Sequence, residues 1–315
     1  MEFNISNKLQ NYLYMTEEEL FKFSKTCPHR YKVYPILKKN GGQRIIAHPA
    51  KELKYIQRFI VNTLKSKISI HHCSFAYKNN INIKHNALLH SSNTYILKMD
   101  FKDFFPSITP LIFFNALKNQ NIYLSKLDSA LLANLLFWKP HRKQKIILSI
   151  GAPSSPLISN IVMYEFDNQI FSLCKELNIT YSRYADDLTF STQEKNLLHI
   201  LPKEIKRILN STYNKKIRIN SEKTSFISKS FQRKVTGLII TNDNKVSIGR
   251  DKKRLISSML HKYKLGILKQ KEDIEKLTGL LSFAFYIEPD FQNKMIKKYG
   301  LETMKNLLKN KNPPI

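Results

Sequence analysis

The chain has 315 residues, of which 42% are hydrophobic and 24% charged, as is typical of a globular protein with a large core. It carries 52 lysines and arginines against 24 aspartates and glutamates, a formal net charge of +28. This excess excludes an acidic surface and favours a polyanionic partner such as nucleic acid. The three cysteines form no CxxC pair, and no apolar run approaches 18 residues. We therefore expect reduced thiols, a cytoplasmic location and no membrane contact.

The N-terminal part predicts helices and a hairpin. Residues 1–30 have helical character, and Thr16, with a glutamate three residues later, is a candidate helix N-cap. Residues 31–49 alternate apolar and polar side chains around Gly41-Gly42, which predicts a β-hairpin. Residues 50–68 then place apolar side chains at helical spacing.

The middle of the chain mixes strands with helices. Residues 94–100 form a short apolar run ending in Asp100, which predicts a buried strand. Helical spacing follows to about Trp138, and again over residues 152–177 after a proline-containing turn. A further helix is expected at about residues 195–212. The remaining strand-like runs are Thr180–Tyr184, Leu188–Ser191 and Lys216–Asn220.

The chain changes character near residue 235. Two short strands are expected, over Val235–Ile240 and Lys245–Ile248, and the remainder is helical. Residues 245–315 carry 16 lysines and arginines against 7 aspartates and glutamates. A basic helical segment of this kind suits binding along the phosphates of a nucleic acid.

A group of carboxylates carries the clearest chemical signal. Asp186 and Asp187 lie in a candidate hairpin turn, Tyr184-Ala185-Asp186-Asp187, and such a pair alone is also typical of an ordinary turn. Asp100, at the end of a buried strand, adds a third carboxylate. Together they can hold two divalent cations about 3.5–4 Å apart for in-line phosphoryl transfer. Hard oxygen ligands select Mg²⁺, with Mn²⁺ as a substitute, whereas Asp103 favours capping the next turn over binding metal.

Five motifs, in order over about residues 35–240, resemble those of bacterial reverse transcriptases. They are Gly42–Ile46, Leu97–Ile108, Gly151–Pro156 followed by Ser159-Asn160, the Tyr-Ala-Asp-Asp hairpin, and Ile219–Thr224. The chain departs from the family at Ile150, where a glutamine is usual. Since isoleucine has no amide, any role of that amide in positioning nucleotide or template falls to the backbone or to neighbours.

The resemblance implies an RNA-directed DNA polymerase with the α+β right-hand fold. We expect N-terminal helices and fingers over residues 1–95, and a catalytic palm of antiparallel sheet and helices, with part of the fingers, over 96–235. A helical, RNA-binding thumb would follow over 236–315. The implied catalytic metal ligands are Asp100, Asp186, Asp187 and the backbone carbonyl of Phe101.

The resemblance also implies residues that bind the nucleotide. Arg44, assisted by Lys38 or Lys39, would clamp the triphosphate, and Lys223 would lie near it. Phe105 would be the steric gate that excludes a ribose 2′-OH, and Gly151 would let the backbone approach a base or sugar closely. Each has a structural alternative: a solvated hairpin charge for Arg44, core packing for Phe105, and a turn glycine at Gly151.

Two further segments narrow the resemblance to retron reverse transcriptases. They are Asn86–His90 and Val235–Gly237, the second preceded by Gln232-Arg233-Lys234. We expect His90, with Asn86 as its hydrogen-bond partner, to support an RNA-binding surface; direct RNA contact is the alternative. The full set of expected RNA-binding residues is Asn86, His90, Arg233, Lys234, Thr236, Gly237, Lys252, Lys253 and Arg254.

A retron enzyme would bind its own structured non-coding RNA, msr-msd, and prime from an internal guanosine 2′-OH. With dNTPs it would make multicopy single-stranded DNA (msDNA), joined to the RNA by a 2′–5′ branch. The resemblance further implies anti-phage defence together with an effector protein encoded nearby. The alternatives are a group II intron-like or diversity-generating reverse transcriptase, and a non-catalytic RNA-binding scaffold on the same fold.

Overall fold

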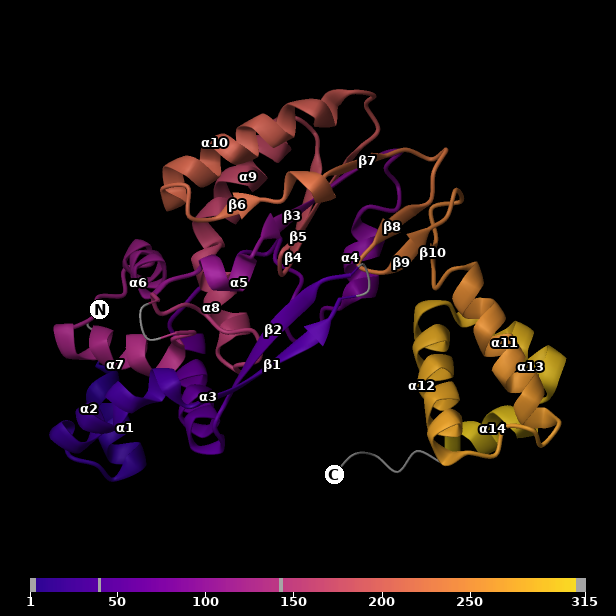
Figure 1. The fold of residues 1–315 in the computed structure, drawn as a ribbon. Helices are drawn as coiled ribbons and strands as arrows, with labels where there is room; N and C mark the ends of the chain where they lie inside the picture. Colours follow the sequence, from indigo (N-terminus) through magenta and orange to yellow (C-terminus); the bar gives the residue numbers. More distant parts are fainter. Residues whose placement is uncertain (1–3, 39–40, 142–143, 310–315) are drawn as a thin grey trace. The chain divides into compact units, whose positions relative to one another are not determined.

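The computed structural model describes residues 4–38, 41–141 and 144–309 (Figure 1). The chain forms two compact units. Unit 1 comprises Met1–Ile81 and Leu97–Phe226, and unit 2 comprises Asn82–Ile96 and Ile227–Ile315. Unit 2 therefore includes a short segment from the first third of the chain. Over the described ranges, every helix is too short or too polar to cross a membrane.

Unit 1 begins with helices and a hairpin, as predicted. The elements are α1 (Ile5–Leu13), α2 (Glu17–Thr26), the 3-10 helix η1 (Cys27–His29), β1 (Tyr31–Leu37), β2 (Gln43–Pro49) and α3 (Lys51–Lys65). The Thr16 hydroxyl accepts from the Glu19 N–H, and the Glu19 carboxylate accepts from the Thr16 N–H at 2.8 Å, so the predicted N-cap is confirmed as a capping box. Gly41 and Gly42 both have positive φ, which explains two glycines beside the hairpin tip.

The rest of unit 1 is a sheet with helices. Its strands are β3 (Tyr95–Lys102), β4 (Thr180–Tyr184), β5 (Asp187–Thr192), β6 (Arg218–Ile219) and β7 (Ser225–Ile227), in the order β4-β5-β3-β6 with β7 also paired to β3. The accompanying helices are α5 (Phe104–Ser107), α6 (Pro110–Asn119), α7 (Lys126–Leu136), α8 (Ser155–Val162), α9 (Tyr164–Glu176), η2 (Leu197–Ile200), α10 (Leu201–Tyr213) and η3 (Ser221–Lys223). The predicted strands are present, although β6 is shorter than expected.

Burial explains why the apolar runs of unit 1 fold as they do. Leu97 on β3 and Leu188 and Phe190 on β5 are fully buried. Helix α8 is buried along almost its whole length, including its polar residues Ser159 and Asn160. Buried polar side chains require hydrogen-bond partners, and those of Asn160 lie at the active site.

Unit 2 combines a small sheet with helices. The elements are α4 (Ile83–Leu89), β8 (Arg233–Val235), β9 (Leu238–Ile240), β10 (Val246–Ser247), α11 (Arg250–Lys264), α12 (Lys271–Ile287), α13 (Pro289–Tyr299) and α14 (Leu301–Lys309), with sheet order β10-β9-β8. The prediction of one strand over Val235–Ile240 was wrong. Thr236 and Gly237 have φ of 46° and 83°, so this segment turns back as a two-residue hairpin.

The division into units differs from the expected domains in one respect. Residues 82–96 were expected with the fingers, yet they belong to unit 2, which resumes at residue 227 rather than 236. The reason is apolar packing: Ala87 and Ile96 are buried in the same core as Val235 and Leu238. Short-range periodicity identifies α4 as an element, but it cannot reveal which distant residues cover its apolar face.

Candidate active site and RNA-binding surface

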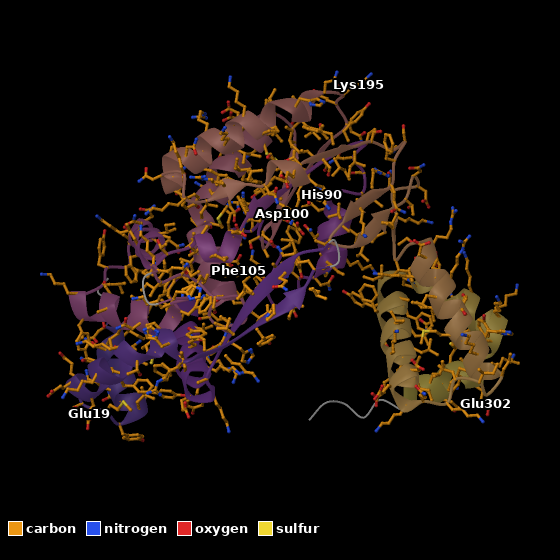
Figure 2. All side chains as sticks on the ribbon, viewed as in Figure 1. Glu19, His90, Asp100, Phe105, Lys195 and Glu302 are labelled. Atoms are coloured by element: carbon orange, nitrogen blue, oxygen red, sulfur yellow. The ribbon has the colours of Figure 1, made fainter. Side chains whose placement is uncertain are left out.

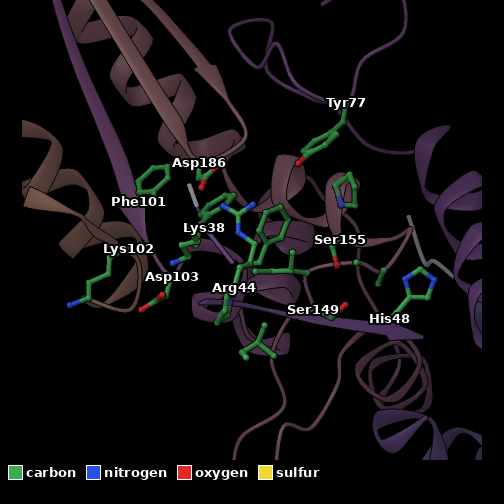
Figure 3. Close-up of a pocket in the computed structure, with 18 of the residues that line it drawn as sticks. Lys38, Arg44, His48, Tyr77, Phe101, Lys102, Asp103, Ser149, Ser155 and Asp186 are labelled. Carbon is green, nitrogen blue, oxygen red and sulfur yellow. The ribbon is translucent and has the colours of Figure 1, made fainter. Parts of the chain in front are cut away.

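A cavity of about 780 Å³ in unit 1 collects most of the predicted catalytic and nucleotide-binding residues (Figure 3). Strands β2 and β3, helix α5, the β4–β5 turn, the loop before α8 and η3 all contribute to its lining. The predicted residues among the lining are Lys38, Arg44, Asp100, Phe101, Phe105, Gly151, Asp186 and Lys223. Asp100 and Phe105 are labelled in Figure 2 within unit 1. Residues far apart in sequence therefore meet at one cavity, whereas the predicted metal ligand Asp187 is not among its lining residues.

Backbone hydrogen bonds tie the carboxylate-bearing elements together. The Phe101 N–H donates to the Asp186 carbonyl at 3.1 Å, which joins β3 to the β4–β5 turn. The Asn220 N–H donates to the Asp100 carbonyl at 2.7 Å, which joins β3 to the segment before η3. Backbone hydrogen bonds therefore fix the positions of Asp100 and Asp186 relative to each other.

The electrostatics of the site favour a cation. Burial, and then the charge of Asp100, raise the pKa of Asp186 above its usual value. Burial, and then the charge of Asp186, raise the pKa of Asp187 to about 6. Like charges held together in a partly buried site repel one another, and a bound divalent cation would relieve that repulsion. An all-oxygen donor set of this kind fits Mg²⁺.

Lys223 is the cation in direct contact with the carboxylates. Its Nζ lies 2.9 Å from Oδ2 of Asp100, whose side chain is only 14% exposed. The hydrogen bond to Asp100 raises the pKa of Lys223, so the lysine stays charged. The predicted contact of Lys223 with a triphosphate remains a prediction, and its position beside the metal ligands is compatible with it.

Arg44 and Lys38 come from the β1–β2 hairpin. Arg44 pairs with Ile36 across the hairpin, is exposed, and lines the cavity (Figure 3). Burial and the charge of Asp100 raise the pKa of Asp186, and the charge of Arg44 offsets only part of that rise. An exposed guanidinium in the wall of a cavity that also holds carboxylates suits bidentate binding of phosphate oxygens. Lys39, the other lysine expected to assist Arg44, lies outside the described residues.

Phe105 differs from its aromatic neighbours. Phe101 and Phe104 are buried and stacked at 5.1 Å, so they belong to the core. All three rings line the cavity, but Phe105 meets Phe104 edge-on at 5.3 Å and is only half-buried. Its position favours the steric-gate hypothesis over simple core packing.

Gly151 has a structural task of its own. Its φ is +119°, and a Cβ there would lie 3.0 Å from Cγ2 of Ile46 and 3.3 Å from the Ala47 carbonyl oxygen. The Ala47 N–H donates to the Ile150 carbonyl at 2.9 Å, which fixes this close approach to β2. The glycine therefore lets the loop before α8 contact the hairpin, while contact with a base or sugar stays a prediction.

Asp103 is the N-cap residue of α5, as expected, but it caps the helix through its backbone and its side chain makes no capping hydrogen bond. Its backbone has φ of 46°, and its carbonyl accepts from the Ser107 N–H at 2.9 Å. The side chain is exposed and lines the same cavity as Asp100. The other lining residues that motifs did not single out include Lys54, Arg58, Tyr77 and Lys102.

A buried polar network behind the catalytic turn escaped the sequence analysis. Arg183 and Asp167 form an ion pair at 2.7 Å, with both side chains 0% exposed. Nη1 of Arg183 also donates to the Asn160 side chain at 3.2 Å and to the Ala185 carbonyl at 3.1 Å. Ala185 lies inside the catalytic turn and has φ of 56°. The network thus holds the turn that carries Asp186. In the sequence, only an arginine within a buried strand pointed to this network.

The predicted RNA-binding residues of unit 2 separate into two groups. The first lines a groove of about 760 Å³ along the β8–β9 hairpin and the start of α11. Its predicted members are Lys234, Gly237, Lys252 and Lys253. Lys234 and Lys252 are exposed, whereas Lys253 forms a close ion pair with Glu288. Arg254 is exposed on the same helix but is not part of the groove lining.

The second group is buried. Asn86 and His90 are both 0% exposed, and burial lowers the pKa of His90 to about 3. Arg233 is 1% exposed and donates to the carbonyls of Asn93 and Thr241. Such burial favours a supporting role over direct RNA contact for all three. The expected Asn86–His90 hydrogen bond is not formed, since both polar atoms of the Asn86 side chain lack a partner.

The β8–β9 turn, which holds one of the two retron-like segments, contacts helix α4, which holds most of the other. The Thr236 hydroxyl donates to the Ile83 carbonyl at 3.1 Å, which fixes the hairpin turn against α4. Helix α4 is in turn held to α12, because Lys84 Nζ donates to the Tyr286 carbonyl at 2.8 Å. Gly237 has φ of 83°, and a Cβ at this position would meet no atom within 4 Å.

Comparison with known proteins agrees with this geometry. The reverse transcriptase (RNA-dependent DNA polymerase) family profile matches residues 36–240. The chain is 44% identical to the retron Ec83 reverse transcriptase of Escherichia coli over 98% of each chain. It is 37% identical to the retron Ec73 enzyme of the same organism, covering 87% of this chain and 89% of that protein. An apo telomerase from Candida tropicalis matches with a TM-score of 0.50 at 14% identity, over 88% of this chain and 63% of the other, which indicates likeness of fold alone.

Proposed function

Because this chain belongs to the retron reverse transcriptases, we propose that it copies part of its own structured RNA into multicopy single-stranded DNA. Synthesis starts at the 2′-OH of an internal guanosine, so that the DNA remains joined to the RNA by a 2′–5′ bond. The RNA-directed DNA polymerase activity itself follows from the family. The self-priming and the cognate msr-msd RNA are the proposal.

Asp100, Asp186 and Asp187, with the carbonyl of Phe101, are the residues that would hold the metal. Enzymes of this family use divalent metal ions, and the all-carboxylate donor set supports two Mg²⁺ ions here. When bound, such a pair lowers the pKa of the attacking hydroxyl and stabilises the leaving pyrophosphate. The backbone bonds from Phe101 and Asn220 keep the carboxylates in place before substrate arrives.

The remaining cavity residues orient the dNTP. Arg44 and Lys38 bind the triphosphate from the hairpin side, and Lys223 stays charged beside Asp100 and faces the same phosphates. The half-buried ring of Phe105 occupies the space that a ribose 2′-OH would need. A nucleotide bound between these groups would have its α-phosphate presented to the carboxylates.

Unit 2 binds the cognate RNA. Lys234 and Lys252 project from the groove and can contact phosphates, with Lys253 and Arg254 adjacent. Three buried residues stabilise the conformation of α4 and the β8–β9 hairpin and do not contact the RNA directly: Asn86, His90 and Arg233. The contact between Thr236 and Ile83 supports this part of the proposal, because it ties the β8–β9 turn, whose Gly237 lines the groove, to α4, the helix that carries Asn86.

The biological setting follows from the same family assignment. The RNA–DNA product stays bound to the enzyme, and the complex restrains an effector protein encoded nearby as part of an anti-phage system. Loss of the product would then release the effector. This proposal makes msDNA synthesis and restraint of the effector depend on the same catalytic carboxylates.

The test is to express the chain with its neighbouring non-coding RNA and to examine the nucleic acid that copurifies with it. The expected product is DNA attached to an internal guanosine of an RNA, separable by an enzyme that cleaves 2′–5′ bonds. The Asp186→Ala variant should copurify with RNA but without DNA. Copurifying DNA that carries a free 5′ end would contradict self-priming.

A further inference from the structure

Tyr77 has a backbone conformation that tyrosine rarely adopts. Its φ is 64°, in the left-handed region that favours glycine and asparagine. Tyr14 also has positive φ, but there the conformation ends helix α1, where its N–H donates to the Gln10 carbonyl. Tyr77 ends no helix; it lies in the turn at Ala76-Tyr77, where a positive φ usually falls to glycine or asparagine.

The strained residue is held from both sides by the network behind the catalytic turn. The Phe75 N–H donates to the Arg183 carbonyl at 2.8 Å, and the Asn160 amide donates to the Ala76 carbonyl at 3.1 Å. On the other side, Lys78 Nζ donates to the His71 carbonyl at 2.7 Å. Backbone strain persists only where the surroundings dictate it, and such sites cluster around active sites.

This fixed conformation directs the Tyr77 ring at the active site. The ring lines the cavity and remains 52% exposed, and in Figure 3 its hydroxyl points in the direction of Asp186. Burial, and then the charge of Asp186, raise the pKa of Tyr77, which agrees with a position close to the carboxylates. The flat ring is therefore displayed at the end of the cavity where an attacking hydroxyl must lie.

We infer that Tyr77 is a substrate-contacting residue whose ring stacks on the base of the nucleotide that carries the attacking hydroxyl. The phosphate-binding cations Arg44 and Lys223 and the candidate gate Phe105 leave that base without an assigned protein contact. An aromatic face suits it because every base has a π-face, so the contact tolerates any sequence. The Arg183–Asn160 network would then fix the catalytic turn and the stacking ring in one arrangement.

The test uses templated extension of an ordinary annealed primer by the full chain. This assay requires the polymerase activity but not self-priming. Its outcome is therefore independent of the proposed retron function. Tyr77→Asn removes the ring yet suits a left-handed backbone, so the protein should fold at least as well as wild type. The matched control is Tyr14→Asn, which makes the same change at a 96% exposed left-handed tyrosine outside the cavity.

We expect Tyr77→Asn to lower kcat/KM for the first addition by about tenfold, the scale of one base–aromatic stack. Tyr77→Phe should stay within about twofold of wild type, and Tyr14→Asn should match wild type. On a primer whose terminal nucleotide lacks its base, Tyr77→Asn should cost little, because the stacking partner is already gone. An equal cost on both primers, an equal loss in Tyr77→Phe, or wild-type kinetics in Tyr77→Asn would each overturn the inference.

Discussion

In unit 1 the ion pair behind the catalytic turn is fully buried, whereas in unit 2 two cations of the groove, Lys234 and Lys252, are exposed. Arg183 and Asp167 are both 0% exposed, and Asp100 is 14% exposed against Lys223. Lys234 and Lys252, by contrast, are exposed. The difference matches the tasks: metal-assisted chemistry needs fixed oxygens, while phosphate binding needs accessible charge.

The largest effect is expected from removing a catalytic carboxylate. Asp186→Ala or Asp187→Ala should lower DNA synthesis by several orders of magnitude and leave RNA affinity unchanged, because a metal ligand is lost only in unit 1. Primer extension and RNA binding measured on the same preparation check this. Asp243→Ala, an exposed aspartate of unit 2, is the control. Normal extension by Asp186→Ala would refute the site assignment.

A second effect concerns the buried pair. Arg183→Met should destabilise the fold by about 3–5 kcal/mol, because it leaves the buried Asp167 carboxylate without its cationic partner, with a hydrogen bond from the Tyr181 hydroxyl still in place. Thermal unfolding should show a midpoint lowered by roughly 10 °C for a unit of this size. Arg207→Met breaks the exposed pair with Glu204 and should change the midpoint little. Equal unfolding midpoints for Arg183→Met and Arg207→Met would contradict the claim that the buried ion pair contributes more to stability than the exposed one.

The third prediction tests whether Phe105 excludes ribonucleotides from the cavity. Phe105→Ala should admit ribonucleotides, shifting the ratio of dNTP to NTP incorporation by tenfold or more, because the space for a 2′-OH is opened. Phe104→Ala, a change in the adjacent core, should mainly lower stability. Unchanged discrimination in a folded Phe105→Ala variant would assign Phe105 to the core.

The fourth prediction concerns the exposed cations. RNA affinity should fall linearly, on logarithmic axes, with salt concentration. Lys252→Glu combined with Arg254→Glu should weaken binding by about tenfold or more and make the salt dependence shallower. Lys253 is best left unchanged because it pairs with Glu288. The charge-matched control is Lys294→Glu with Lys297→Glu on α13; an equal loss in the control would mean that net charge, not the groove, governs binding.

Sequence motifs identified the catalytic cavity well because each carries a residue type dictated by chemistry. Asp100, Asp186, Arg44 and Phe105 all meet at one cavity, as expected. The motifs could not reveal the strained backbone of Tyr77 or the buried pair of Arg183, since both depend on contacts between distant segments.

In unit 2 the family motifs singled out segments whose polar side chains prove to be buried. The burial of Asn86 and His90 favours the expected supporting role over direct RNA contact, whereas Arg233, which was expected to bind RNA, is buried as well. Their burial is set by the packing of α4 against the small sheet, which no local pattern encodes. The hairpin at Thr236-Gly237 was missed because the apolar residues on either side of it resemble one continuous strand.

The most direct test compares two syntheses by one variant, Thr236→Ala with Gly237→Val. This change removes the hydrogen bond to Ile83 and strains a backbone with φ of 83°, so it disturbs the groove without touching unit 1. Gly266→Val, which strains a left-handed position of unit 2 outside the groove lining, is the control. We predict that the double variant, shown to be folded by circular dichroism, loses self-primed synthesis on the cognate RNA while extending an annealed primer on an unrelated template. An equal fall in both activities, or a fall in neither, would contradict the separation of catalysis in unit 1 from RNA recognition in unit 2.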